Sequence, residues 1–173
     1  MTQRITREFF ARDVLVVAPV LLGKFLCRQF EDGHVEKKLI TEVEAYRGEE
    51  DLAAHVSKGR TARTEVIYGG AGFVYVYFIY GMYWLINIVT GRVDEPQAAL
   101  IRGVEGVSGP GRVGKWLQLD RSFYGEDVTI SNRLWVEDSN LAIPVEKITQ
   151  TPRIGVDYAG EWAKKPWRWV LQS

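Results

Sequence analysis

The stretch that decides the fold of this chain is FVYVYFIYGMYWLINIV, residues 73–89. It contains no charged residue, and four of the eight tyrosines of the chain lie in it, at positions 75, 77, 80 and 83. β-branched and aromatic residues favour strands, and the glycine near the middle marks a turn. The segment therefore predicts a β-hairpin with Tyr80 at its tip.

Two registers are open for this hairpin. If Tyr80 and Gly81 alone form the turn, the numbers of paired residues add up to 161, and Asn87 lies on the face away from Tyr77. If Met82 also belongs to the loop, paired numbers add up to 162, and Tyr77 and Asn87 share a face. Only the second register lets these two side chains meet one ligand.

The tyrosines decide between three interpretations of the segment. A membrane-spanning helix needs about 20 apolar residues, and here polar groups lie inside the run rather than at its ends. In a hairpin that only packs into a core, each buried hydroxyl needs a partner or costs about 1–3 kcal/mol. Rings with a polar end instead suit a flat polar ligand such as a nucleobase, whose stacking contributes about 1–3 kcal/mol.

Composition narrows the class of protein without naming a partner. The chain has 173 residues, the size of one domain, and we expect a single domain over residues 1–173. Its 22 basic and 22 acidic residues cancel, so nucleic-acid binding would need a local basic patch. The charged N-terminus MTQRITREFF lacks the apolar core of an export signal, and we expect a cytoplasmic protein, associated with the nucleoid if bacterial.

The few cysteines and histidines, and the lack of nucleotide-binding motifs, argue against metal and cofactor chemistry. One cysteine, Cys27, excludes an internal disulfide framework, and with only His34 and His55 beside it a zinc site of the usual kind is disfavoured. The segment YGGAG lacks the spacing of a dinucleotide fingerprint, and no Walker loop occurs. We expect no metal and no cofactor.

The remaining elements predict an α+β fold. An Asp-Gly turn joins KFLCRQF to VEKKLITEVEAYR as a second hairpin, and PQAALIRGVEGV predicts another strand. We expect an N-terminal helix capped by Thr6 or Asp13, a second helical segment from about Pro19 to Gly23, and a third helix that is entered from the Gly-rich turn in SGPGRVGKWLQL. Without regular βαβ alternation, the sheet should be curved and largely antiparallel, with flanking helices and a protruding hairpin.

A pair of strand carboxylates gives the first indication of chemistry. In TEVEAYRGEEDLAAH, alternation places Glu42, Glu44 and Tyr46 on one face of a strand. Strand glutamates usually form a solvent face. Here His55 follows nine residues after Tyr46, and a basic loop with Lys58 comes next, which favours a site.

In order and spacing, five segments resemble the alkyladenine (3-methyladenine, methylpurine) DNA glycosylases, and the resemblance runs from about residue 10 to the C-terminus. They are TEVEAYRGEEDLAAH, YVYFIYGMYWLINIV, the IR of AALIRGVEG, SGPGR and AGEWAKKP. The resemblance implies a monofunctional base-excision enzyme that flips a damaged purine, such as 3-methyladenine, out of duplex DNA and hydrolyses its N-glycosidic bond. It leaves open whether 7-methylguanine, hypoxanthine and ethenoadenine are also substrates.

The resemblance also implies roles for individual residues. Glu44 would be the general base, and Arg102 would help to hold the water. Three residues would sandwich the flipped base: Tyr46, His55 and Tyr77. Asn87 would disfavour the amino group of normal guanine, and Tyr80, with Met82 beside it, would fill the gap left in the stack. The expected partner is double-stranded DNA with a damaged purine, bound by a monomer away from any membrane.

The last group of expected contacts is with the DNA backbone. Loop cations could bind phosphates, and we expect this of Arg60, Arg63 and Arg112. The loop departs from the family pattern at Ala62 and Thr64, and so does Trp116 after SGPGR. Two alternatives stay open: a non-enzymatic nucleic-acid binder, which needs the rings but not Glu44, and an interaction module that docks through the hairpin.

Overall fold

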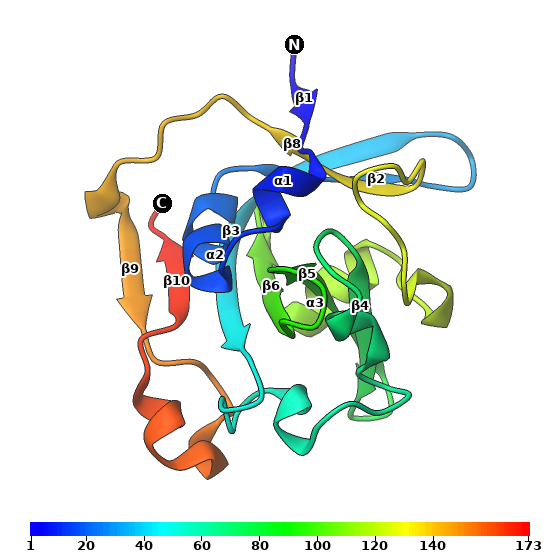
Figure 1. The fold of residues 1–173 in the computed structure, drawn as a ribbon. Helices are drawn as coiled ribbons and strands as arrows, with labels where there is room; N and C mark the ends of the chain where they lie inside the picture. Colours follow the sequence, from blue (N-terminus) through cyan, green and yellow to red (C-terminus); the bar gives the residue numbers. More distant parts are fainter.

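The fold is built on strands that join one long antiparallel sheet (Figure 1), in a computed structural model that describes all 173 residues. The strands are β1 (Gln3–Arg4), β2 (Phe25–Gln29), β3 (Val35–Arg47), β4 (Val74–Ile79), β5 (Tyr83–Thr90), β6 (Gln97–Val104), β7 (Val107–Ser108), β8 (Leu134–Asp138), β9 (Ile148–Thr151) and β10 (Arg168–Leu171). The α-helices are α1 (Arg7–Phe10), α2 (Val14–Leu21) and α3 (Pro110–Trp116). Short 3-10 segments are η1 (His55–Lys58), η2 (Glu65–Tyr68), η3 (Arg121–Phe123), η4 (Val145–Lys147) and η5 (Asp157–Lys164).

Strand β3 organises the sheet. Its first half pairs with β2, and its second half pairs with β6 on one side and with β10 on the other. The register against β6 shifts twice between Ile40 and Val43, so the strand is irregular where it passes from one neighbour to the next. The strand order is β1-β8-β2-β3-β6-β5-β4, and every pair is antiparallel. The predicted α+β class is confirmed.

The N-terminal helices differ from the prediction in one respect. Asp13 rather than Thr6 caps a helix, because its carboxylate accepts a hydrogen bond from Leu15 N at 2.9 Å. The expectation that Pro19 begins a helix is wrong, since Pro19 lies inside α2. The helix tolerates it because the apolar face that includes Val14 and Leu21 is fully buried, and this packing outweighs the one missing backbone bond.

The tyrosine-rich hairpin adopts the register that sums to 162. Val74 pairs with Ile88, Tyr75 with Asn87, and Ile79 with Tyr83, so Tyr80, Gly81 and Met82 form the loop. Tyr80 has a φ of 55°, in the left-handed region that residues other than glycine rarely adopt. The three-residue loop is therefore confirmed, and Tyr77 and Asn87 share a face.

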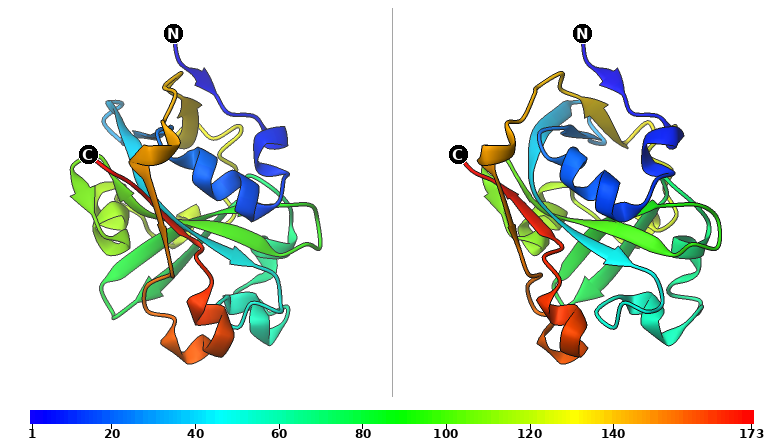
Figure 2. Two further views of the ribbon diagram at one scale, coloured as in Figure 1. Left: turned by 90° about the vertical axis from the view of Figure 1, so that its left-hand side faces the viewer. Right: turned by 60° about the vertical axis from the view of Figure 1, so that its left-hand side comes forward.

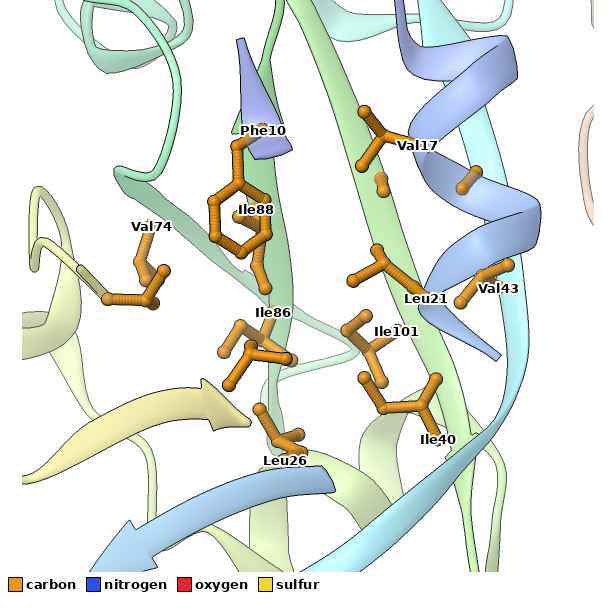
Figure 3. Packing of buried hydrophobic residues seen from close by; sticks show 14 of the residues in the cluster. Phe10, Val17, Leu21, Leu26, Ile40, Val43, Val74, Ile86, Ile88 and Ile101 are labelled. Atoms are coloured by element: carbon orange, nitrogen blue, oxygen red, sulfur yellow. The ribbon is translucent and has the colours of Figure 1, made fainter. Parts of the chain in front are cut away.

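Alternation along four strands separates a core face from a second face. Figure 3 shows the core face, where Val43 of β3, Ile101 of β6 and Ile86 of β5 pack together with Leu21 of α2. Residues at the intervening positions point to the opposite side of the sheet. That side carries the tyrosines and Glu44, and it forms the wall of a cavity.

The 3-10 segments close the second face at one end of β3. Figure 2 shows η5, in orange and red, and the segment around η1, in teal, on either side of the end of β3. Segments far apart in the sequence thus meet at the cavity. No helix is both long and apolar enough to span a bilayer.

Candidate active site

A cavity of about 560 Å³ lies on the second face of the sheet. Its size is typical of sites for small molecules or single residues of a polymer. The structure brings seven of the predicted site residues to its wall: Tyr46, His55, Tyr77, Tyr80, Asn87, Arg102 and Arg112. They come from β3, η1, the β4–β5 hairpin, β6 and α3.

Glu44 lies behind this wall with no exposed surface. Its Oε1 accepts a hydrogen bond from the Tyr46 hydroxyl at 2.9 Å, and its Oε2 accepts one from Ile154 N at 2.7 Å. Arg102 Nη1 lies 3.6 Å from Oε1, which is beyond hydrogen-bond distance. Burial raises the pKa of Glu44, against the lowering effects of Arg102, the Ile154 amide and Tyr46. A carboxylate with a raised pKa is a stronger base.

Arg102 is held by a second carboxylate rather than by Glu44. Its Nε donates to Glu42 Oε1 at 3.0 Å, and Arg168 Nε donates to the same oxygen at 2.7 Å. Glu42, Glu44 and Arg102 are largely buried on the same side of the sheet. The predicted strand alternation thus brings both glutamates next to one guanidinium.

Aromatic rings are prominent in the lining of the cavity. His55 and Tyr77 meet edge to face with ring centroids 4.6 Å apart, and His55 Nδ1 forms a hydrogen bond with the Tyr75 hydroxyl at 2.7 Å. Burial lowers the pKa of His55 to about 4, with Arg63 and Lys58 adding to the effect. The imidazole is therefore neutral at physiological pH.

Tyr46 and Asn87 complete the lining. The pKa of Tyr46 is raised well above its ordinary value, first by burial and then by the charge of Glu44, so its hydroxyl stays protonated and donates to that carboxylate. Asn87 is 4% exposed, and its Nδ2 donates to the carbonyl of Tyr75 at 3.2 Å. This bond fixes the amide of Asn87 at the cavity wall.

The hairpin tip stands out from the cavity. Tyr80 is 83% exposed and Met82 is 54% exposed, which is unusual for side chains this large and apolar. Phe78 and Trp84, on the other face of the hairpin, pack against each other with ring centroids 5.1 Å apart. The tip therefore presents an exposed ring on a rigid support.

The three predicted phosphate-binding arginines lie in different surroundings. Arg112, in α3, lines the cavity. The Arg63 guanidinium lies 5.5 Å from the centre of the Tyr77 ring. Arg60 is engaged by two carboxylates, with Nη2 2.7 Å from Glu65 and Nη1 3.0 Å from Asp94. Phosphate contact by these residues stays a prediction, and Arg60 would have to leave its carboxylate partners to make it.

A buried ion pair between Asp51 and Arg153, which the sequence patterns do not indicate, shapes the site. Arg153 Nη1 lies 2.6 Å from Asp51 Oδ2 and Nη2 lies 2.9 Å from Oδ1, and neither side chain has exposed surface. Arg153 directly precedes Ile154, whose amide binds Glu44. The guanidinium also lies 4.9 Å from the centre of the Tyr46 ring. The pair thus anchors the chain segment that covers Glu44. In the sequence, the only indication of this pair is one acidic and one basic residue in loops far apart along the chain.

Two of the three departures from the family pattern have structural explanations. The Thr64 hydroxyl donates to Gly59 O at 3.2 Å and accepts from Thr61 N at 2.9 Å, which closes the basic loop. The indole of Trp116 donates to Glu36 at 2.6 Å, with Lys38 over its ring, and it joins α3 to β3. Nothing in the structure explains Ala62 beyond its carbonyl, which accepts from Tyr124. The structure contains no cluster of three metal-binding side chains.

Comparisons with known proteins identify the family of this chain. A sequence model of the methylpurine-DNA glycosylase (MPG) family matches residues 8–108 and 106–173. A relative from Methanocella arvoryzae is 44% identical over 184 residues, covering 95% of this chain and 90% of the relative. Relatives from Desulfitobacterium hafniense and Legionella pneumophila are 38% and 41% identical, each covering 99% of this chain and 96% of the relative. The names of all three assign them provisionally as 3-methyladenine DNA glycosylases.

The family model and the relatives place the chain in the class of DNA glycosylases, which are hydrolases of N-glycosyl bonds in DNA. Within this class, the chain belongs to the methylpurine-DNA glycosylase family. A DNA substrate follows from membership of the family.

Proposed function

We propose that the protein is a monofunctional 3-methyladenine DNA glycosylase that takes the damaged purine out of the duplex and hydrolyses its N-glycosidic bond with a water activated by Glu44. The observation that carries the proposal is the position of Glu44. It is a fully buried carboxylate beside Arg102, directly behind an aromatic cavity at the base of an exposed hairpin. An enzyme that acts on a base needs a pocket of this kind to receive the extruded nucleotide.

The reaction we propose requires little acid assistance. Alkylation at N3 gives adenine a positive charge, so the base leaves as a neutral molecule when the C1′–N9 bond breaks and both electrons pass to the purine. The water oxygen forms a bond to C1′ and its proton passes to Glu44. The carboxylate also opposes the positive charge that develops on the sugar. A general base contributes about 10²–10⁴-fold in rate.

The cavity walls support selection of the base. Tyr46 and Tyr77 offer ring faces to a flipped purine, and a cationic base gains about 0.5–2 kcal/mol from such faces. Asn87, held by its bond to Tyr75 O, would meet the amino group of normal guanine. Tyr80 would occupy the space that the extruded base leaves in the stack. His55 is neutral, so it adds no like charge beside a cationic purine.

Base release by the wild type and by Glu44→Gln tests the proposal. We expect the wild-type protein to release 3-methyladenine from alkylated duplex DNA and to leave an abasic site that breaks only after treatment with base. Glu44→Gln should bind the same DNA while losing nearly all turnover, and Glu105→Gln, an exposed glutamate in the turn after β6, serves as the matched control. Strand cleavage without added base, or undiminished turnover of Glu44→Gln, would contradict the proposal.

A further inference from the structure

Glu42 contacts neither the cavity nor Glu44. It does bind Arg102, which lines the cavity and lies beside Glu44. Its Oε1 accepts from Arg102 Nε at 3.0 Å and from Arg168 Nε at 2.7 Å. Arg168 is fixed in turn by a bond from Nη1 to the Thr151 hydroxyl at 2.9 Å. Arg102 is therefore held toward Glu42 and β10, although it also lines the cavity.

The distance from Arg102 to Glu44 is the feature that needs explanation. An arginine beside a fully buried carboxylate would normally form short, charge-assisted hydrogen bonds of about 2.7–2.9 Å. Here Arg102 Nη1 and Glu44 Oε1 are 3.6 Å apart. Oε1 accepts one hydrogen bond, from Tyr46, and a carboxylate oxygen has the capacity for a second. A small movement of Arg102 would fill that second position.

We propose that Glu42 is a positioning residue that holds Arg102 out of hydrogen-bond contact with Glu44 and thereby keeps one lone pair of Oε1 available for the attacking water. This inference rests on the proposed role of Glu44 as the base. It assigns to the first glutamate of TEVEAY a function distinct from that of the second. Glu42 acts only through Arg102 and does not contact the substrate.

Several charged and polar groups around Glu44 affect its pKa. They are Tyr46 and Glu42 on β3, Tyr77 on β4, Arg102 on β6, Arg168 on β10, and Arg153 with Ile154 N in the covering segment. Removing the charge of Glu42 has a direct effect on Glu44, because one like charge disappears, and an indirect effect, because Arg102 is released. Both effects lower the pKa of Glu44. Only the indirect effect depends on Arg102.

A double-mutant cycle separates these effects. We would measure the titration midpoint of Glu44 by carbon-13 NMR of the free protein, and the single-turnover base release against pH, in the wild type, Glu42→Gln, Arg102→Gln and the double variant. In Glu42→Gln the midpoint and the acid limb should move to lower pH, and release at pH 7 should fall by about tenfold or more. In the Arg102→Gln background, adding Glu42→Gln should shift the midpoint much less.

The outcomes are distinct for the inference and for the proposed function. A midpoint that does not fall in Glu42→Gln, or that falls equally with and without Arg102, overturns the inference whatever the catalytic result. A wild-type protein that releases no base instead contradicts the proposed function. Arg168→Gln is the matched control, because it removes the other cation on Glu42 and should not lower the midpoint. If Glu42→Gln does not fold, Glu42→Asp replaces it: the shorter carboxylate draws Arg102 further from Glu44, so a lowered midpoint would refute the inference.

Discussion

The ion pair between Asp51 and Arg153 leads to the sharpest stability prediction. The Asp51 carboxylate accepts four hydrogen bonds, two from Arg153 at 2.6 and 2.9 Å, one from Arg47 N at 3.0 Å and one from Ala53 N at 3.1 Å. Asp51→Ala removes all of them and leaves a guanidinium without exposed surface and without a counter-charge. Breaking a buried pair by removing one partner typically costs about 3–5 kcal/mol.

That cost is large compared with the stability of a domain of this size. Stabilities of about 5–15 kcal/mol are usual, and for 150–250 residues about 1 kcal/mol shifts Tm by roughly 2–4 °C. We therefore expect Asp51→Ala to lower Tm by about 6–20 °C. Urea unfolding followed by the fluorescence of the six tryptophans measures the free energy of unfolding. Glu161→Ala, which removes an exposed partner of Lys164, should leave the unfolding midpoint unchanged.

A second substitution tests the reasoning behind this number. If the cost comes from an uncompensated charge, replacing both partners with apolar residues, as in Asp51→Leu with Arg153→Met, should restore much of the stability. The double variant should nevertheless release base slowly, because the segment that carries Ile154 loses its anchor. A loss below about 1 kcal/mol for Asp51→Ala, or a double variant less stable than the single one, would refute the argument.

Three further predictions concern the site. Tyr80→Ala should weaken binding to abasic-site DNA by about 5–150-fold, as measured by fluorescence anisotropy, because it removes about 1–3 kcal/mol of stacking. Glu44→Gln should unfold at a higher urea concentration than the wild type at pH 7. Burial raises the folded-state pKa of Glu44, so the wild type loses stability as the pH rises through that pKa. The difference in stability between the variant and the wild type should vanish well below pH 4.5. The pKa of His55 is lowered to about 4, so its contribution to stability is complete above its ordinary pKa of 6.5 and is lost as pH falls toward 4. His55→Gln should therefore lose less stability than the wild type between pH 7 and pH 4.5, and an equal loss would contradict this account.

Local patterns in the sequence were sufficient to predict the hairpins, whose paired strands follow each other along the chain. The Asp-Gly turn gave the β2–β3 hairpin, and a three-residue loop gave the correct register of the β4–β5 hairpin. The position of Pro19 inside α2 could not be predicted, because it depends on burial of the helix face against β3 and β6. The pairing of β10 with β3 joins residues more than a hundred positions apart and leaves no local signal.

The candidate site shows the same division. Strand alternation placed Glu44 and Tyr46 on one face, and the structure adds the hydrogen bond between them. The contacts that adjust Glu44 come from elsewhere: Ile154 N lies 110 positions away, and Arg153 pairs with Asp51 across 102 positions. Sequence patterns thus indicated the candidate base, and only the tertiary structure identifies the groups that control its charge.

The charges around Glu44 explain why burial, rather than the arginines, sets the direction of its pKa. Two guanidiniums contribute lowering effects, and an unshared arginine at this depth would hold a carboxylate well below its ordinary range. Each is instead bound to another carboxylate: Arg102 to Glu42, and Arg153 to Asp51. These partners offset much of the positive field, so the desolvation of Glu44 dominates. A base of higher pKa is the result, and any substitution that frees either arginine should make Glu44 a weaker base.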